Sequence, residues 1–464
     1  MAGQGRFLTG STMGHVVRMT LTGAIGITFV FLVDAANLFW IAQLQQPQLM
    51  AAIGYAFAIQ FLSVSAGIGL MIAATALVSR AIGAGKRRLA RKQAASALVI
   101  GVLVQSAVAA IIFTFRHQFV ALAGAGGETA ALAARYLALT VPSLGVMAGG
   151  MIANATLRAE GDGVRSMSVT LISGGVALVI DPFLILGLGW GLDGAAAGVV
   201  LSRFVMLGAA LYFATRAHDL IARPRKRDCL GSVRPYLVIA IPAIITQMAT
   251  PVGNYIFTSV MSQFGDEAMA GWAVVGRLTV VAFGGIFSLA GAIGGIFGQN
   301  FGARDYARVR CTYRDAILFG IGYTLVTWAV LIAATGPVSR AFALPETAAG
   351  VLYAFTRYGA AGFVFASALF VSNSAFNATG KPRRASLTNW IRDGILSLPL
   401  ALWFAAWFGA PGVIYAQAAA GALAGLAAAA WGWHYVSQLH RCGLPGLDLP
   451  APRSYAHADR FRRR

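Results

Sequence analysis

The chain of 464 residues is 58% hydrophobic and only 11% charged, and it carries a formal net charge of +20. Soluble domains carry about 25% charged residues, so this composition, with a mean hydropathy of +0.71, excludes an ordinary soluble domain and indicates a polytopic membrane protein. The basic excess does not indicate nucleic-acid binding, because most Lys and Arg residues lie in short segments between apolar stretches.

Twelve apolar stretches are long enough to cross a bilayer, which takes about 20 helical residues. We expect membrane-spanning helices at residues 18–43, 49–81, 94–116, 129–157, 164–188, 192–215, 234–262, 267–301, 312–335, 346–378, 385–408 and 411–438. The sequence therefore predicts an all-α integral membrane protein. No compact signal-peptide pattern occurs before the first span, so we expect the N-terminal segment to be retained.

Basic residues alternate along the connections between these spans. The even-numbered connections are rich in Lys and Arg, as in Lys86–Lys92 and Arg216–Arg234, whereas the odd-numbered ones hold few. Basic connections stay on the cytoplasmic side of a membrane. We therefore expect a multi-pass protein of a bacterial cytoplasmic (inner) membrane with both termini in the cytoplasm.

The chain also repeats itself. A shift of 219 residues aligns Ser79–Lys86 with Gly298–Asp305 and Asn154–Gly161 with Asn373–Gly380. Six spans are an even number, so the two copies would be parallel repeats about an axis along the membrane normal. We expect an N-terminal six-helix lobe at 1–216, a cytoplasmic linker at 217–233, a C-terminal six-helix lobe at 234–440 and a basic cytoplasmic tail at 441–464.

Two such bundles imply a cleft between them, which is the layout of alternating-access carriers. A channel or a polytopic enzyme could have the same two-bundle architecture, so architecture alone does not decide function.

Asp34 is the only charged residue between Arg18 and Arg80. A carboxylate at the bilayer centre costs roughly 3 kcal/mol, so such residues are rare and mark functional sites by default. The alternative is an interhelical hydrogen bond with a purely structural role.

A second acid, Asp181, lies in the outer half of the fifth span, at a depth similar to that of Asp34. Two carboxylates facing one apolar cavity suit the binding of a proton or a cation. Pro182 follows Asp181 and interrupts the helical hydrogen bonds, so the aspartate alternatively belongs to a kink.

The second half lacks this pair. The repeat places Gly253, next to Asn254, at the position of Asp34, and it places Leu400 at the position of Asp181. Asp393 is the third acid inside a span, and its neighbour Arg392 favours a local ion pair there. Three more basic residues lie within spans, and each could reach the interface, form a pair or line the cleft: Arg203, Arg277 and Arg357.

Motifs for other chemistries are missing from the sequence. The six His and three Cys residues are scattered, so no metal site is predicted. No GxxxxGK[ST] motif occurs, so the chain carries no P-loop motor of its own, and no nucleophile set supports an enzyme. We expect no cofactor.

Six short motifs, in order along almost the whole chain, resemble the multidrug and toxic compound extrusion (MATE) transporters of the MOP superfamily. They are Val33-Asp34, Leu157–Asp162, Asp181-Pro182, Gly191–Ala196, Gly298–Ala303 and Asn377–Pro382. The resemblance implies an efflux carrier with two six-helix lobes, driven by H⁺ or Na⁺, that exports varied and often cationic compounds. It also implies cation coupling at Asp34 and Asp181 and a polar fourth-span position at Asn154.

Three positions depart from the family pattern. Ala177 stands where an Asn is frequent, Val199 where a Thr is frequent, and Thr250 where some members carry a glutamate. These departures place the chain nearer the bacterial DinF-like branch and favour protons over sodium.

The sequence therefore predicts a proton-coupled, less favourably sodium-coupled, exporter of small amphipathic molecules. Its partners would be small-molecule substrates and the lipid bilayer, without nucleic acid, and we expect a monomer. Supporting polar or substrate-lining positions are predicted at Asn37, Tyr55, Asn154, Asn254 and Asn373. The alternatives are a lipid-linked saccharide flippase of the same superfamily, whose cleft would be lined with arginines, and a polytopic membrane enzyme or structural protein.

Overall fold

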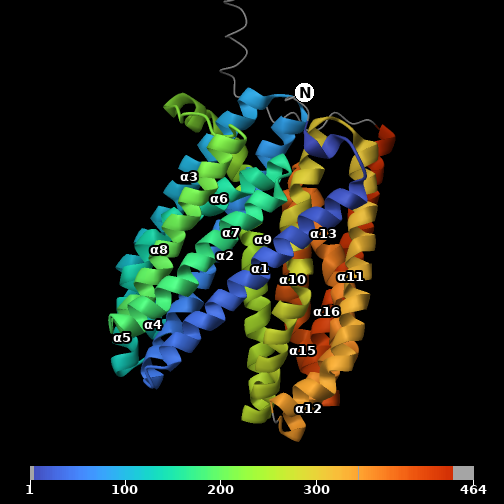
Figure 1. Ribbon diagram of the computed structural model, residues 1–464. Helices are drawn as coiled ribbons and strands as arrows, with labels where there is room; N and C mark the ends of the chain where they lie inside the picture. Colours follow the sequence, from blue (N-terminus) through green and yellow to red (C-terminus); the bar gives the residue numbers. More distant parts are fainter. Residues whose placement is uncertain (1–4, 343, 443–464) are drawn as a thin grey trace, which may run out of the picture. The chain divides into compact units, whose positions relative to one another are not determined.

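The computed structural model describes residues 5–342 and 344–442, which fold into helices joined by turns (Figure 1). Twelve helical segments within this part are long and apolar enough to cross a membrane, which confirms the twelve predicted spans. The helices extend beyond the apolar stretches, for example to Thr12, Lys226 and Tyr306, because the polar residues at their ends remain helical. The residues of the predicted basic tail from 443 onward lie outside the described part.

Some spans are single helices and others are interrupted by a 3₁₀ or π turn. The elements are η1 (Arg6–Leu8), α1 (Thr12–Ala42), α2 (Pro47–Gly83), α3 (Arg87–Thr114), α4 (Arg116–Leu122), α5 (Gly127–Thr140), η2 (Val141–Ser143), α6 (Leu144–Glu160), α7 (Gly163–Pro182), η3 (Phe183–Gly187), α8 (Gly191–Tyr212), η4 (Phe213–Ala217), α9 (Lys226–Met261), η5 (Ser262–Phe264), α10 (Asp266–Gly302), α11 (Tyr306–Ala341), α12 (Glu346–Ala354), η6 (Phe355–Gly359), η7 (Ala360–Gly362), α13 (Phe363–Thr379), α14 (Pro382–Trp390), η8 (Ile391–Leu396), α15 (Ser397–Phe408) and α16 (Ala410–Cys442).

The backbone repeats at the positions that the sequence repeat pairs. Gly161 after α6 and Gly380 after α13 both end their helices in the left-handed conformation, with φ of 95° and 86°. Gly85 and Arg304 likewise both have positive φ, of 70° and 61°. Glycine adopts this conformation without strain, which explains three of the four residues. The two halves therefore share local geometry as well as sequence, as the duplication predicts.

The described residues pack into two compact units. Phe29–Ile244 form the first unit, and Gly5–Thr28 pack with the residues from Ile245 onward in the second. The first half of α1 thus packs with the second unit. The predicted domain boundaries, which follow the sequence repeat, stay a prediction.

Each unit has its own apolar core. In the first unit α6 packs against α2, α3 and α8, and α7 packs against α8. In the second unit α13 packs against α10 and α16, and α15 packs against α16. The buried side chains are mostly Ala, Leu, Ile and Val, and small residues let the helices approach closely.

Candidate functional site

Asp34 and Asp181 are brought together by the packing of α1 on α7 in the first unit. Gly174 makes this packing close, because a Cβ added there would lie 2.7 Å from a ring carbon of Phe29. Further along the same two helices, the Asn37 side-chain amide donates a hydrogen bond to Asp181 Oδ2 over 2.9 Å. Asp34 lies one turn before Asn37 on α1 and within electrostatic range of Asp181.

The two carboxylates differ in their surroundings. Asp34 is exposed on the surface of α1, whereas only 3% of Asp181 is accessible. Asp181 Oδ1 is buried without a hydrogen-bond partner in the described part of the chain. A buried carboxylate oxygen without a donor is costly when charged, so this oxygen is suited to hold a proton or to contact a cation.

Gly198 of α8 closes the other side of Asp181. A Cβ added to Gly198 would lie 1.9 Å from Asp181 Oδ1, so any side chain there would displace the carboxylate. Pro182 ends α7, and the chain then widens into the π turn η3, as expected where a proline removes a helical hydrogen bond. Asp181 therefore lies next to the proline that precedes the π turn and also beside Asn37, so the structural and the functional interpretations of its position are compatible.

Arg203 of α8 is buried in a socket of neutral oxygens. It donates to the Thr140 carbonyl over 2.7 Å, to Ser143 Oγ over 2.7 Å and to Gln60 Oε1 over 2.8 Å. Gln60 Nε2 donates in turn to the Thr140 hydroxyl over 2.9 Å. No ion pair involves Arg203 among the described residues, so it is neither at the interface nor paired with an acid.

The 3₁₀ turn η2 makes this socket possible. The Leu144 amide bonds to the Val141 carbonyl, and the Thr140 carbonyl accepts from two side chains, Arg203 and the Ser143 hydroxyl, each over 2.7 Å. Pro142 favours this break because it has no N–H. The hydroxyl of Tyr136, on α5, lies within electrostatic range of Arg203, Asp181 and Asp34. The sequence did not predict Gln60 and Ser143 as partners of Arg203, because neither residue lies in a motif that indicates a polar site.

The second unit has a different arrangement at the matching place. Asp393 of η8 lies against α9, where a Cβ added to Gly253 would be 2.8 Å from Asp393 Oδ1. Arg392 binds both oxygens of Asp393, over 2.8 Å and 2.7 Å. The local ion pair predicted from the sequence is thus present, and it leaves Asp393 no oxygen without a donor.

The other predicted polar positions lie elsewhere. Asn154 is buried about six residues before the end of α6, whereas Asp181 lies about 18 residues after the start of α7, so they differ by roughly 18 Å along the helices. Asn373, buried in α13, accepts a 3.4 Å hydrogen bond from Thr388. Tyr55 is half-buried on α2, and Asn254 is exposed on α9. Of these residues and Asn37, only Asn37 bonds to the acidic pair in the described chain.

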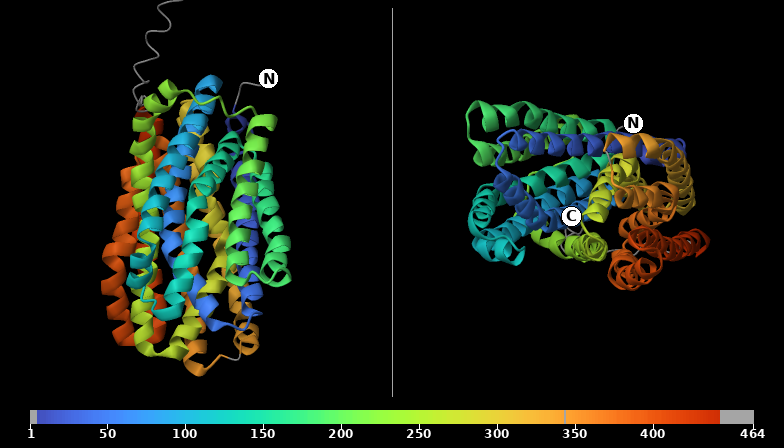
Figure 2. Two further views of the ribbon diagram at one scale, coloured as in Figure 1. Left: turned by 90° about the vertical axis from the view of Figure 1, so that its left-hand side faces the viewer. Right: turned by 90° about the horizontal axis from the view of Figure 1, so that it is seen from below.

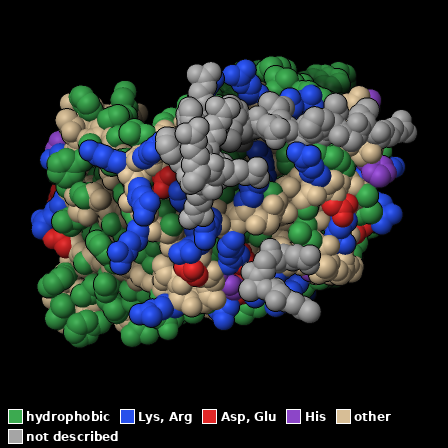
Figure 3. Space-filling view, turned by 90° about the horizontal axis from the view of Figure 1, so that it is seen from above, with side chains coloured by type: hydrophobic (Ala, Val, Ile, Leu, Met, Phe, Trp, Pro, Cys, Tyr) green, Lys and Arg blue, Asp and Glu red, His purple; other side chains and the backbone are tan. Residues whose placement is uncertain are grey.

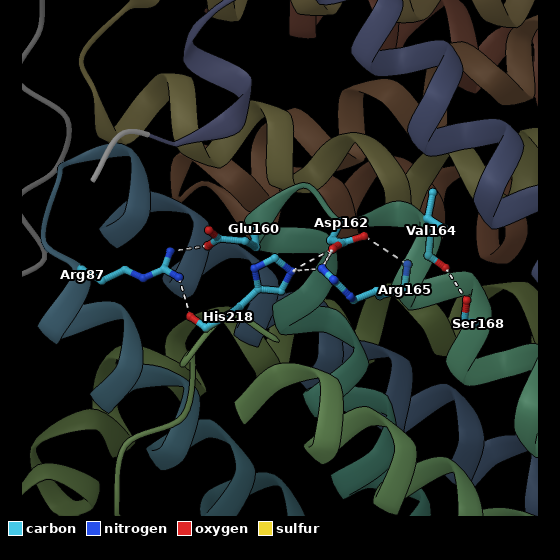
Figure 4. A network of polar contacts seen from close by, with 7 residues as sticks. All are labelled: Arg87, Glu160, Asp162, Val164, Arg165, Ser168 and His218. Carbon is cyan, nitrogen blue, oxygen red and sulfur yellow. Dashed lines mark hydrogen bonds and ion pairs between the residues drawn. The ribbon is translucent and has the colours of Figure 1, made fainter. Parts of the chain in front are cut away.

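A polar network ties the connection after α8 to the ends of α3, α6 and α7 (Figure 4). His218 Nε2 lies 2.8 Å from Asp162 Oδ2, and Arg165 Nη1 lies 2.6 Å from the same oxygen. Arg87 contacts Glu160 over 2.5 Å and donates to the His218 carbonyl over 2.6 Å. This network holds part of the predicted linker against the first unit.

Asp162 is the acidic centre of that network. Burial opposes its ionisation, but hydrogen bonds from the Arg165 amide, from His218 and from the Arg165 guanidinium outweigh burial and hold the pKa of Asp162 below its ordinary value. Its Oδ1 also caps α7 by accepting from the Arg165 amide over 3.1 Å.

Comparison with known proteins identifies the family. The sequence matches the MatE family twice, over residues 24–183 and over residues 242–403. The chain belongs to the MatE family. One match lies in each half of the predicted sequence repeat. Together with the twelve candidate spans, the matches establish a multi-pass membrane transporter rather than an enzyme.

Two relatives and one solved structure illustrate the similarity. The FAD transporter of Shewanella oneidensis is 24% identical over 409 residues, covering 85% of this chain and 88% of that protein. The multidrug export protein MepA of Staphylococcus aureus is 23% identical over 423 residues, covering 89% and 92%. A crystal structure of a MATE protein in complex with MaL6 has a TM-score of 0.87 at 22% identity, covering 94% and 99%, and it confirms the fold.

Proposed function

We propose that this MatE-family protein exports small amphipathic, often cationic compounds in exchange for protons by alternating access. The observation that carries the proposal is the buried, unpartnered Oδ1 of Asp181, next to Asn37 and Asp34 in the first unit. Protonation of such a carboxyl removes a charge that is costly to bury. Release of the proton to the other side of the membrane would draw on the transmembrane potential, which supplies about 2.3 kcal/mol per charge per 100 mV.

The orientation of Asn37 supports protons over sodium. Asn37 offers its amide nitrogen to Asp181, because only a donor bonds to a carboxylate oxygen. Hard cations take oxygen ligands, and Gly198, which lies against Asp181 Oδ1, contributes no side-chain oxygen. The proposal keeps the predicted placement in a bacterial cytoplasmic membrane with cytoplasmic termini, and it uses no cofactor.

The name of MepA supports a drug-like substrate, since that relative is a multidrug export protein similar over most of this chain. Ethidium, a flat lipophilic cation, is therefore the first substrate to test. The protein would be placed in proteoliposomes with an acidic lumen and no sodium, and lumenal accumulation of ethidium would be followed by fluorescence.

Wild type should accumulate ethidium until a protonophore collapses the gradient. Asp34→Asn and Asp181→Asn should lose most of this accumulation, and Asp266→Asn, an exposed aspartate at the start of α10, should retain it. Undiminished transport by folded Asp34→Asn would remove Asp34 from the mechanism. Accumulation driven equally by a sodium gradient would replace the proton with sodium.

A second candidate substrate class is favoured by two exposed arginines. Arg277 in α10 and Arg357 in η6 each lie about three turns into a span, and neither forms an ion pair with any described residue. An arginine exposed to lipid is costly, so these side chains suit an aqueous path taken by an amphipathic anion. The FAD transporter relative and the lipid-linked saccharide alternative both fit such a substrate.

The test is uptake of FAD by the same proteoliposomes, which separates this candidate from ethidium export. Arg277→Gln and Arg357→Gln should then lower FAD transport, with Arg340→Gln, an exposed arginine near the end of α11, as the control. Absence of FAD transport, with ethidium transport intact, would reject the anionic class represented by FAD.

A further inference from the structure

A basic cavity lies where α3 begins, against the connection between η4 and α9. Its volume is about 390 Å³, within the range of small-molecule sites. Its charged lining residues are Arg88, Arg91, Lys92, Arg223, Arg225 and Asp228. All of them belong to the first unit. Lys and Arg side chains gather on the face that carries these loops (Figure 3).

The positive charge of this cavity is only partly balanced. Lys92 contacts Asp228 over 3.2 Å, and Arg91 contacts Asp219 over 2.8 Å. Arg91 Nε is nevertheless buried without an acceptor in the described chain. The remaining lining arginines are exposed and form no ion pair with any described residue: Arg88, Arg223 and Arg225. The cavity therefore presents three arginines that no described carboxylate compensates.

The cavity is held in shape by contacts between its two walls. The Ala222 amide donates to the Arg91 carbonyl over 3.3 Å, and the Arg91–Asp219 ion pair joins the same two segments. Arg87 also holds this connection, at the residue before Asp219, by donating a hydrogen bond to the His218 carbonyl. The left view of Figure 2 shows this connection, in green, running across the ends of neighbouring helices. The arginines are thus presented by an anchored segment.

The depth of the cavity suits a lipid phosphate. Arg88, Arg91 and Lys92 occupy the first two turns of α3, and the apolar part of that span begins at about residue 94. From this boundary we expect the basic wall at the level of the phospholipid headgroups. Basic pockets at the cytoplasmic ends of spans bind phosphorylated headgroups, and the predicted orientation places this end in the cytoplasm.

We propose that this cavity binds a phosphate anion, presented by the headgroup of an acidic phospholipid or by a soluble phosphorylated compound. Arginines recognise phosphate through paired, charge-assisted hydrogen bonds, and three exposed arginines of the lining, Arg88, Arg223 and Arg225, supply such donors. Occupancy would bind the connection to α3 more tightly, independently of the acidic pair at Asp34 and Asp181.

The experiment titrates the purified full-length protein in a neutral detergent with short-chain phosphatidylglycerol, phosphatidylcholine or glycerol phosphate. Thermal stability and native mass spectrometry report binding. The test variant carries Arg88→Gln, Arg223→Gln and Arg225→Gln together. The matched control carries Arg216→Gln, Lys226→Gln and Arg227→Gln, which removes three exposed charges from the same segment but outside the cavity lining.

Phosphatidylglycerol should bind wild type and the control alike, and it should bind the test variant on the order of 100-fold more weakly. Stabilisation by phosphatidylglycerol alone would identify a lipid site, and equal stabilisation by glycerol phosphate would identify a soluble ligand. Equal binding by the test variant and the control would overturn the proposal, as would equal binding of phosphatidylcholine. Thermal stability of each variant without ligand reports whether it is folded.

Discussion

Gly198 of α8 and Asp181 of α7 are in direct contact, with the glycine backbone covering the carboxylate oxygen that has no described hydrogen-bond partner. The contact requires glycine, because the Cβ of any other residue would lie 1.9 Å from Asp181 Oδ1. The proposed coupling site thus depends on a residue without a side chain as much as on its acids.

Gly198→Ala should displace the Asp181 carboxylate and lower gradient-driven ethidium transport at least tenfold. The matched control is Gly208→Ala on the same helix, where an added Cβ meets nothing within 4 Å. The control should transport like wild type, and its stability should equal or slightly exceed that of wild type, because alanine favours helix by up to about 1 kcal/mol. Equal transport rates for the two variants would contradict the assigned role of the contact.

Asn37→Ala should leave Asp181 Oδ2 without its donor. A lost hydrogen bond to a charged group costs about 1.5–3 kcal/mol, so we expect a roughly tenfold or larger fall in transport rate. Initial rates in proteoliposomes measure this effect. Gln118→Ala, at an exposed amide of α4, serves as the control and should leave the rate unchanged. A similar loss in both variants would indicate a general effect of removing an amide.

Arg203→Gln should destabilise the protein by about 3 kcal/mol, because it breaks a buried set of charge-assisted hydrogen bonds to Thr140, Ser143 and Gln60. Thermal unfolding in detergent measures the loss. Arg277→Gln, at an exposed arginine of α10, should unfold at the wild-type temperature. Wild-type stability of Arg203→Gln would show that the socket relaxes around a neutral side chain.

Asp162 predicts a specific pH dependence of stability. Its pKa is lowered on folding, so its charged contacts stabilise the folded state above the unfolded pKa, near 3.9. The contribution falls away as pH drops below that value and through the folded pKa. Asp162→Asn should therefore lower the free energy of unfolding by about 1 kcal/mol at pH 7 and by much less near pH 3. The effect at pH 7 is modest because Arg165 is partly exposed, so solvent screens its ion pair with Asp162.

Asparagine is also a good helix cap, so Asp162→Asn separates charge from capping, whereas Asp162→Ala removes both. Asp305, which caps α11 by accepting from the Arg308 amide over 3.0 Å, supplies the comparison variant Asp305→Asn. Unfolding temperatures measured at both pH values test the prediction. A cost of Asp162→Asn that persists unchanged near pH 3 would show that its charge is not responsible.

The twelve spans, the duplication and the rarity of intramembrane acids can all be predicted from the amino-acid pattern alone. These features depend on local hydrophobicity and charge, because a span must be apolar over its own length wherever it packs. The basic connections predict orientation for the same local reason. Asp34 and Asp181 stood out because a charge is conspicuous in an apolar stretch.

The surroundings of those residues, in contrast, depend on how the helices pack in three dimensions. The Arg203 socket joins Gln60 and Ser143 from separate helices, and the Asp181 site needs Gly198, which is one of 55 glycines in the sequence. The separation of Asn154 from Asp181 likewise follows from the positions of the two residues along packed helices. Such contacts depend on which helix faces pack together. Small residues and turns determine these faces, and each acts on a helix that lies far away in the sequence, so the contacts cannot be read from a local pattern.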